Sequence, residues 1–395
     1  MAETQEVVVL SGVRTAIGDY GGSLKSFSPT DLGALVVAEA IKRSSVDPGQ
    51  IGQGVMGNVI HTQPMDMYVS RVSCIKGGMS HDSGALTVNR LCGSGLQAIV
   101  CASQMIMLGD TDFAVGGGVE SMSNAGYQAP GVRWGARMGD SNLIDMMVGA
   151  LTDPFDTVHM GVTAENIAEK WGLNREEQDE FAVESHRRAA AAIAAGRFKD
   201  QILPIEVKSR KGVTVVDTDE HVRADVTVDG MAKLRAAFKR DGTVTPGNAS
   251  GINDGGAALV LASAAAAEKQ GLQPMARLVS YSIAGVDPSI MGEGPIPAVK
   301  QVMQRTGLKV SDMDVIEANE AFAAQAMAVC RGLDFDTAKT NPNGGAIALG
   351  HPIGATGAIV TVKALYELQR IGGRYALVTM CIGGGQGIAA IFERV

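Results

Sequence analysis

Two stretches of this 395-residue chain resemble each other at a long and nearly constant offset. The first, LVVAEAIKRSSVDPGQIGQGVMGN, ends at Asn58, and the second, AVKQVMQRTGLKVSDMDVIEAN, ends at Asn319. Each contains a helix pattern, a short turn and an apolar strand. A further match, SGLQAIV with TGAIVTV, follows 37 residues after Asn58 at Gly95 and 38 residues after Asn319 at Gly357. An internal repeat of this length predicts two halves with the same architecture.

The repeat also predicts how the chain is divided. Phe113 and Tyr375, each eighteen residues beyond the matched glycine, open the apolar strands FAVGGG and YALVTM. Alternating helices and strands indicate an α/β fold, and loops at strand ends between two packed halves are where catalytic groups tend to lie. The expected boundaries are 1–120 with 247–270 for the N-terminal half, 121–246 for an inserted loop domain, and 271–395 for the C-terminal half.

Composition and charge exclude several classes of protein. Apolar residues make up 46% of the chain and charged residues 19%, which is typical of a folded globular protein rather than a disordered one. The net charge of −8 argues against nucleic acid as a partner. One stretch departs from this balance, because Arg197 to Arg240 holds ten basic and seven acidic residues. Such a stretch is typical either of a solvated loop or of a phosphate-binding surface.

Cysteine usage and hydropathy limit the compartment and the cofactors. The five cysteines include no CxxC pair and no Cys/His cluster at zinc spacing, which argues against a disulfide framework and against a metal site. The N-terminal MAETQEVVVLSGVRT lacks the basic region of a signal peptide. The uncharged stretch Tyr375 to Phe392 holds four glycines and predicts two buried strands rather than a membrane span. We therefore expect a cytoplasmic protein that binds no metal and no membrane.

Cys92 in VNRLCGSGLQAIV follows a strand pattern and precedes a helix expected over 93–107. A helix N-terminus carries partial positive charge that favours thiolate over thiol, so Cys92 is a candidate nucleophile. Two alternatives remain open from the residues alone. Most free cysteines are small buried residues, and Gly93 to Ala98 fits the G-x-G-x-x-A dinucleotide fingerprint, with Asp112 downstream.

His351 lies in the glycine-rich stretch NPNGGAIALGHPIGATG. A purely structural histidine rarely occupies such a flexible backbone, which favours a functional role. Because Gly357 is the repeat counterpart of Gly95, the His351 turn is the counterpart of the Cys92 turn. Two symmetry-related turns facing one cleft would bring the imidazole within hydrogen-bonding reach of the thiol, as activation of a cysteine requires.

Two further segments contain residues suited to catalysis. Cys381 ends a buried strand pattern in MCIGGGQG, and the glycines after it expose N–H groups that can form an oxyanion hole. Asn319 ends the strand of the second repeat, where its amide could anchor a water or cap a helix. His159 lies beside an expected helix start and could line a pocket. The remaining histidines are expected to be ordinary surface or packing residues: His61, His81, His186 and His221.

Two thiols and a histidine suit one particular reaction. The first thiol accepts an acyl group as a thioester after the histidine has taken its proton. The second thiol removes a proton from the α-carbon of another acetyl thioester, and the resulting enolate attacks the acyl-enzyme. Each carbonyl oxygen then needs its own oxyanion hole. This is a thioester Claisen condensation, whose reverse is thiolytic cleavage.

The chain resembles the thiolase family over essentially its whole length, with SGVRTAIG near the start and GHPIGATG and CIGGGQG near the end. It is most similar to the bacterial short-chain β-ketothiolases and acetyl-CoA acetyltransferases, among them those that serve polyhydroxyalkanoate synthesis and accept three-carbon acyl groups. The resemblance implies a five-layered αβαβα fold with an inserted loop domain. It also implies a homotetramer built from tight dimers, which binds acyl-CoA and CoA as substrates and no other cofactor.

The resemblance implies a role for each candidate catalytic residue. Cys92 would be the acylated nucleophile, His351 its activator and Cys381 the acid and base at the α-carbon. Asn319 would hold a water that forms one oxyanion hole with His351. The backbone N–H groups of Cys92 and Gly383 would form the other.

The resemblance also implies the substrate contacts. The insert would cover coenzyme A, with pantetheine or nucleotide contacts at Leu151, His159, Arg223 and Ser250 and an acyl pocket bordered by Met160, Met291 and Phe322. Two positions depart from the family pattern near the coenzyme, since Pro246 stands where relatives often have Ala and Gly230 where some have Ser.

Four alternatives compete with a short-chain thiolase. A longer-chain degradative 3-ketoacyl-CoA thiolase would share every catalytic residue. A decarboxylating condensing enzyme of the ketoacyl synthase type would use Cys with two His, or Cys-His-Asn, and no second reactive thiol. A nicotinamide oxidoreductase would rely on residues 93–98, and an acyl-CoA-binding protein would not need reactive cysteines.

Overall fold

The computed structural model describes residues 5–210 and 212–395, so residues 1–4 of the expected N-terminal half and residue 211 of the expected insert lie outside the described residues. The strands of the N-terminal half are β1 (Val7–Thr15), β2 (Gly18–Asp19), β3 (Gln53–Gly57), β4 (Gly84–Val88), β5 (Phe113–Ser121) and β11 (Asn253–Ser263). Those of the C-terminal half are β12 (Ala276–Gly285), β13 (Val315–Ala318), β14 (Tyr375–Ile382) and β15 (Gln386–Arg394). All of them join one hydrogen-bonded sheet system.

Strand order confirms the repeat that the sequence predicts. From its edge inward, the C-terminal half runs β13-β14-β15-β12, and the N-terminal half runs β3-β5-β11-β1, with β4 added outside β3. In both halves the outermost of the four strands is parallel to its neighbour and the others are antiparallel. The halves join through β1 and β12, where Val8 pairs with Arg277 and Val9 pairs with Ala276. Within the sheet, the two halves therefore meet over a short antiparallel pairing of β1 with β12.

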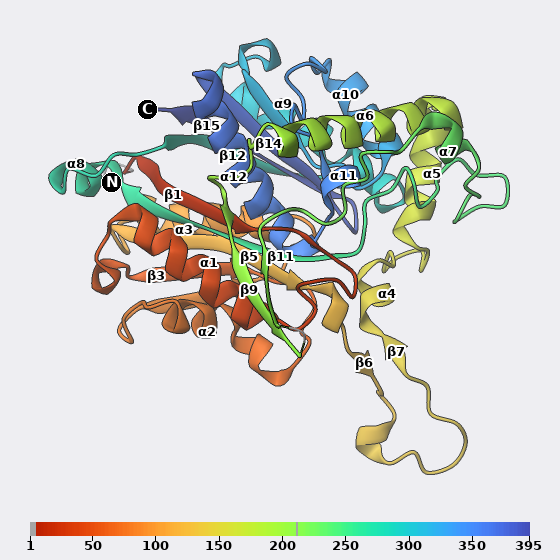
Figure 1. Ribbon diagram of the computed structural model, residues 1–395, viewed down its shortest axis with the longest axis horizontal. Coiled ribbons are helices and arrows are strands. Elements are labelled where there is room, and N and C mark those ends of the chain that lie inside the picture. Colours follow the sequence, from red (N-terminus) through yellow and green to blue (C-terminus); the bar gives the residue numbers. More distant parts are fainter. Residues whose placement is uncertain (1–4, 211) are drawn as a thin grey trace.

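Helices cover both faces of each half. They are α1 (Pro29–Ser44), α2 (Val69–Lys76), α3 (Ser94–Met107), α9 (Pro295–Thr306), α10 (Ala323–Leu333) and α12 (Ile353–Ile371). Helices α1 and α2 cover the outer face of the N-terminal half, α9 and α10 lie outside the C-terminal half, and α3 packs against α12 between them (Figure 1). This arrangement is the five-layered αβαβα fold, so the predicted fold class is confirmed.

The two glycines that revealed the repeat are the contact point of the central helices. A Cβ at Gly95 of α3 would lie 2.6 Å from the backbone N of Ala358, and one at Gly357 of α12 would lie 2.3 Å from the backbone N of Leu96. Only glycine allows the backbones of two helices to approach this closely. Their crossing places the N-terminal turns of α3 and α12, which carry the candidate catalytic loops, next to each other.

The insert consists of α4 (Met146–Ala150), α5 (Met160–Trp171), α6 (Arg175–Ala194), α7 (Val228–Ala232) and the short strands β6 (Tyr127–Gln128), β7 (Ile144–Asp145), β8 (Ile202–Leu203), β9 (Ile205–Ser209) and β10 (Gly212–Val216). Helices α5, α6 and α7 lie together at one end of the C-terminal half (Figure 1). The insert also contacts the N-terminal half, where β8 pairs with β1 and the buried Arg14 guanidinium donates to both carboxylate oxygens of Asp219, at 2.7 and 2.9 Å. These contacts connect the insert to both halves.

The remaining short helices are α8 (Ala264–Lys269), α11 (Ala346–Leu349) and the 3-10 turns Pro48–Gln50, Pro64–Tyr68, Met122–Asn124, Val132–Trp134, Pro288–Glu293 and Val310–Asp312. Within the described residues, none of the helices combines the length and the apolar composition needed to span a bilayer.

Candidate active site

Cys92 lies on the turn that leads from β4 into α3, at the junction of the two halves. A Cβ at Gly93 would lie 2.6 Å from Cδ1 of Ile382, so the start of α3 rests against the end of β14 in the other half. The backbone N–H groups of Gly383 and of Cys92 itself lie close enough to the Cys92 sulfur to lower the pKa of its thiol. These are the two N–H groups that the resemblance assigns to an oxyanion hole, and both lie beside the same sulfur.

The surroundings of the Cys92 sulfur keep it protonated at neutral pH. Burial raises the pKa of the thiol to about 11, against the lowering effect of the Gly383 and Cys92 N–H groups, and the Glu120 carboxyl adds to the increase. The partial charge at the helix N-terminus therefore does not outweigh desolvation. A base must take the proton before the sulfur can attack, which makes the position of His351 decisive.

His351 is buried at the entrance to α12 with its ring orientation determined by a threonine. Its Nδ1 lies 2.7 Å from Oγ1 of Thr356, and that hydroxyl donates its single hydrogen to the carbonyl of Pro352 at 2.9 Å. Nδ1 must therefore carry the ring hydrogen and donate it to Oγ1, which leaves a lone pair on Nε2. Within the described residues Nε2 has no hydrogen-bond partner, and burial lowers the pKa of the imidazole to about 4. The ring is a neutral acceptor at pH 7.

The N-terminal half holds the His351 turn in place. Asn253 of β11 accepts the His351 backbone N–H at 2.8 Å and donates to the carbonyl of Gly18 at 3.1 Å. Gly350 has a φ of +107°, and a Cβ there would lie 2.6 Å from the Asn253 amide carbon. A glycine is thus required on both conformational and steric grounds.

Cys381 is fully buried on β14, close enough to Cys92 for the two sulfurs to influence each other. Burial, and then the proximity of the Cys92 sulfur, raises the pKa of its thiol well above the ordinary value. It belongs to an apolar cluster that also contains Met160, Met291 and Phe322. The three residues expected to border the acyl pocket therefore surround the second thiol.

Asn319 and its repeat counterpart Asn58 have different surroundings. The Asn58 amide donates to the carbonyl of Val119 and to the carboxylate of Glu120, both at 3.0 Å. Asn319 is 2% exposed, yet neither its Oδ1 nor its Nδ2 has a partner among the described residues. A buried amide left unpaired costs about 1–3 kcal/mol, so such a group calls for a partner such as a bound water. In the N-terminal half the asparagine amide binds neighbouring protein groups. In the C-terminal half the equivalent amide is available to bind a water or a substrate.

Glu120 is a residue near the site that the sequence analysis missed. Its carboxyl accepts the N–H groups of Val59, Ile60 and Gly354, at 3.1, 3.0 and 2.8 Å, and so connects the His351 turn to the N-terminal half. Burial raises its pKa to about 8 despite these hydrogen bonds. The detectable signal was a lone carboxylate at the end of the apolar strand FAVGGGVES.

The expected substrate-contact residues fall into two groups. The first lies beside the thiols: His159 stacks on Phe238 at 4.6 Å between ring centroids, and Phe238 meets Phe322 edge-on at 6.3 Å. The backbone of Leu151 accepts from Met160, next to His159. The second group is Arg223 alone, which lines a separate cavity of about 240 Å³. The other residues of its lining are His186, His221, Val226, Gly230, Met231, Leu234, Pro246, Gly247 and Ile347.

The lining of that cavity shows where three sets of residues named in the sequence analysis lie. His186 and His221, which the sequence analysis set aside as surface or packing residues, face the same cavity as Arg223. Both family departures, Gly230 and Pro246, also line it. Ser250 lies outside its lining, since its N–H instead donates to the carbonyl of Ala321 next to the acyl-pocket cluster.

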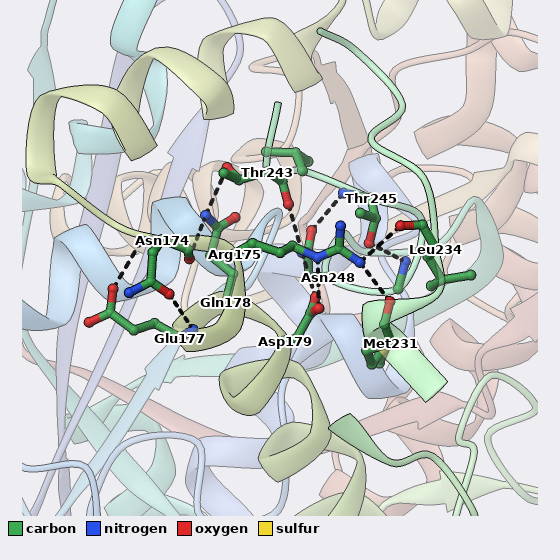
Figure 2. Close-up of polar contacts among 12 residues, drawn as sticks. Asn174, Arg175, Glu177, Gln178, Asp179, Met231, Leu234, Thr243, Thr245 and Asn248 are labelled. Atoms are coloured by element: carbon green, nitrogen blue, oxygen red, sulfur yellow. Dashed lines mark hydrogen bonds and ion pairs between the residues drawn. The ribbon is translucent and has the colours of Figure 1, made fainter. Parts of the chain in front are cut away.

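A polar network holds the wall of this cavity (Figure 2). The Arg175 guanidinium at the start of α6 donates to the carbonyls of Met231 and Leu234, at 2.6 and 3.0 Å, and pairs with Asp179 at 2.7 Å. Asp179 in turn accepts from the Asn248 amide at 2.9 Å. Asn174 and Glu177 cap α6 reciprocally, which fixes where the helix begins.

Other chemistries find less support in this site. Gly95, the second glycine of the possible dinucleotide fingerprint, is used for helix crossing and has no space above it for a pyrophosphate. Among residues 5–210 and 212–395, no cluster of three or more His, Cys, Asp or Glu side chains suits a metal ion. A duplicated α/β fold with two neighbouring sulfurs, and with a neutral, unpaired imidazole nitrogen on the turn before α12, instead defines a candidate cysteine-dependent acyltransferase.

Comparisons with known proteins identify the family. The thiolase N-terminal domain matches residues 7–265 and the thiolase C-terminal domain matches residues 272–394. The chain is 65% identical over 393 residues to the β-ketothiolase BktB of Cupriavidus necator, covering 99% of this chain and 100% of that protein. It is 48% identical over 392 residues to an acetyl-CoA acetyltransferase of Pseudomonas aeruginosa, again covering 99% and 100%.

Solved structures agree. The acetyl-CoA acetyltransferase of Bacillus anthracis superimposes with a TM-score of 0.98 at 43% identity, over 100% of both chains. Human mitochondrial 3-ketoacyl-CoA thiolase in complex with CoA superimposes with a TM-score of 0.97 at 45% identity, over 100% of this chain and 99% of that one. The chain belongs to the thiolase family, and the resemblance drawn from its sequence is confirmed.

Proposed function

We propose that this chain is a β-ketothiolase that condenses acetyl-CoA with acetyl-CoA or a short acyl-CoA, and that cleaves short 3-ketoacyl-CoAs by thiolysis in the reverse direction. The observation that carries the proposal is that the Cys92 thiol, with the N–H groups of Gly383 and of Cys92 itself beside it, lies close to a second, buried thiol. High identity to proteins named as β-ketothiolase and acetyl-CoA acetyltransferase supports it.

In the first half-reaction, Nε2 of His351 takes the proton of the Cys92 thiol. The thiolate attacks the acyl carbonyl, the bond from carbon to the CoA sulfur breaks, and the departing CoA thiolate takes the proton back from His351. The N–H groups of Cys92 and Gly383 stabilise the oxyanion that forms on the acyl oxygen. The enzyme now carries a thioester at Cys92, of similar energy to the thioester that it consumed.

In the second half-reaction, His351 takes the proton of the Cys381 thiol, and the resulting thiolate removes a proton from the α-carbon of acetyl-CoA. The enolate attacks the acyl carbon, the new carbon–carbon bond forms, and the bond to the Cys92 sulfur breaks. The Cys92 thiolate then takes the proton held by His351, and Cys381 keeps the α-carbon proton, which restores all three residues. The unpaired amide of Asn319 holds a water that stabilises the enolate oxygen together with His351.

The two groups of contact residues are proposed to bind different parts of the substrate. Leu151, His159 and Ser250 lie along the approach to the thiols and would contact pantetheine, and Arg223 would meet a phosphate in the 240 Å³ cavity. The insert at 121–246 acts as the loop domain that covers coenzyme A, beside the halves at 1–120 with 247–270 and 271–395. No cofactor besides the CoA of the substrate is proposed, and the compartment is the cytoplasm.

A comparison of acyl chain lengths tests the function. Because Met160, Met291 and Phe322 close the apolar cluster around Cys381, we expect acetoacetyl-CoA and 3-ketovaleryl-CoA to be cleaved with kcat/KM within about tenfold of each other, and 3-ketooctanoyl-CoA at least about a hundredfold less well. Thiolysis is followed by the loss of enolate absorbance. Equal cleavage of the longer substrate would instead favour the longer-chain degradative thiolase, and no cleavage of any of them would refute the proposal.

An exposed arm supports assembly into a homotetramer. The β6–β7 hairpin and the loop at its tip project from the body of the chain (Figure 1), and the loop exposes Trp134 by 88% and Met138 by 98%. A lone hairpin is marginally stable in water, and exposed apolar side chains mark association surfaces. We propose that these arms pack against those of other copies of the chain.

We expect light scattering after size-exclusion chromatography to report a tetramer for the unaltered protein. A Trp134→Ser, Met138→Ser variant should elute as a smaller assembly, because it removes the apolar side chains that associate. The control is Leu108→Ser, which replaces an exposed apolar residue at the C-terminal end of α3. This variant should remain a tetramer. A monomeric unaltered protein would contradict the proposal.

A further inference from the structure

The residue before the nucleophile has an unfavourable backbone. Leu91 has a φ of +43°, in the left-handed region that costs a non-glycine residue about 1–2 kcal/mol. Such a conformation persists only where the surroundings determine it, and it is found preferentially at functional sites. The side chain of Leu91 also reaches the second half, since a Cβ at Gly383 would lie 3.0 Å from its Cδ1.

Ser94, the first residue of α3, supplies most of the contacts that hold Leu91. Its Oγ donates to the Leu91 carbonyl at 2.6 Å, and its backbone N–H donates to the same carbonyl at 2.9 Å. Its Oγ also accepts the N–H of Arg90 at 2.9 Å, and Asn89 accepts the N–H of Leu91 at 2.9 Å. Ser94 is completely buried, so water cannot replace its hydroxyl.

Those contacts determine the direction of one catalytic group. The chain contains no cis peptide bond among the described residues, and in a trans peptide the carbonyl and the N–H point in opposite directions within one plane. The carbonyl of Leu91 and the N–H of Cys92 belong to the same peptide. Because Ser94 draws that carbonyl towards the start of α3, the N–H of Cys92 points the other way, where the N–H of Gly383 also converges.

We propose that Ser94 is a positioning residue that aims the Cys92 N–H at the oxyanion by holding the strained Leu91–Cys92 peptide. This inference rests on the thiolase function proposed above. Oxyanion donors accelerate acyl transfer because they are oriented before the charge develops. Without the hydroxyl, Leu91 can leave the left-handed region and rotate the N–H away from the pocket. The Cys92 side chain remains in place, because its Cα stays at the start of α3.

Acyl transfer and alkylation respond differently to this change, which provides the test. Acylation by a thioester passes through a tetrahedral oxyanion, whereas alkylation of Cys92 by iodoacetamide does not. For Ser94→Ala we expect kcat for acetoacetyl-CoA thiolysis to fall by about tenfold or more. KM and the rate of iodoacetamide alkylation should stay within about twofold of the unaltered enzyme. A purely structural role for Ser94 would change alkylation and thiolysis together.

Matched variants separate the hydroxyl from the volume of the side chain. Ser103→Ala removes another fully buried α3 hydroxyl, which donates to the carbonyl of Ile99, and should leave both rates unchanged. Ser94→Thr and Ser94→Val introduce side chains of about equal volume, of which only threonine has a hydroxyl. These two variants serve as the test if Ser94→Ala does not fold. We then expect thiolysis by Ser94→Thr to be at least about tenfold faster than by Ser94→Val. Equal kcat for Thr and Val, or an unaffected Ser94→Ala, would overturn the inference. Failure of the unaltered enzyme to cleave acetoacetyl-CoA would instead count against the proposed function.

Discussion

Replacement of Cys92 by alanine is expected to reduce kcat for acetoacetyl-CoA thiolysis by about ten-thousandfold or more, because no acyl-enzyme can form without the sulfur. KM and the folded state should change little, since Cys92 is partly exposed and sits on a turn rather than in the core. The measurement is steady-state thiolysis, with the mass of the protein after exposure to acetyl-CoA as a second readout. The unaltered enzyme should gain one acetyl group, and the variant none.

A nearby cysteine offers the matched control. Cys101 lies on α3, the helix that follows the Cys92 turn, is also partly exposed, and accepts a hydrogen bond from the Gln97 amide at 3.2 Å. Cys101→Ala should retain the kcat of the unaltered enzyme and should still be acetylated. Substantial activity in Cys92→Ala would show that another residue carries the acyl group and would refute the proposed mechanism.

Replacement of Cys381 by serine is expected to lower kcat for condensation and for thiolysis by about a thousandfold, while acetylation of Cys92 by acetyl-CoA continues. In the proposed mechanism the second thiol only moves the α-carbon proton, and a serine hydroxyl, which stays un-ionised, is a far weaker base than a thiolate at that position. Burial raises the pKa of the Cys381 thiol, so the thiolate of Cys381 is a strong base. Its replacement therefore affects the transfer of the α-carbon proton directly. Rapid-quench measurement of acetyl-enzyme formation separates the two half-reactions.

This second variant also decides between related enzyme classes. A decarboxylating condensing enzyme generates its enolate by loss of carbon dioxide and needs no second thiol, so Cys381→Ser would leave it largely active. Cys74→Ser provides the control for a buried cysteine, because Cys74 packs in the N-terminal core away from the site. A Cys381→Ser enzyme with unchanged condensation would contradict the role proposed for this residue.

The two matched asparagines have different surroundings that the sequence does not reveal. The repeat showed that Asn58 and Asn319 occupy equivalent strand ends, and the strand order confirms this equivalence. Nothing in the local sequence distinguishes them, however, because the difference lies in what surrounds each amide. Val119 and Glu120 accept hydrogen bonds from the amide nitrogen of Asn58, whereas neither polar atom of the Asn319 amide has a partner among the described residues.

Hydrogen-bonding details of the site were equally invisible in the sequence. The tautomer of His351 depends on where the Thr356 hydroxyl sends its hydrogen, and the Pro352 carbonyl that receives it is in place only because α12 begins there. The role of Glu120 depends on backbone N–H groups from both halves. Ser94 looked like an unremarkable residue between two glycines, and its importance follows from the backbone of Leu91.

The sequence by itself determined the two-fold repeated α/β architecture, since apolar periodicity and a constant offset are local properties that survive in a list of letters. It also singled out the cysteines, the histidine and the glycine-rich turns, because reactive side chains in such turns are unusual enough to notice. Only the tertiary structure decided that these turns meet, through helices α3 and α12 crossing at Gly95 and Gly357. Hydrogen-bond partners, desolvation and backbone direction arise when distant segments pack together, and these govern the chemistry of the site.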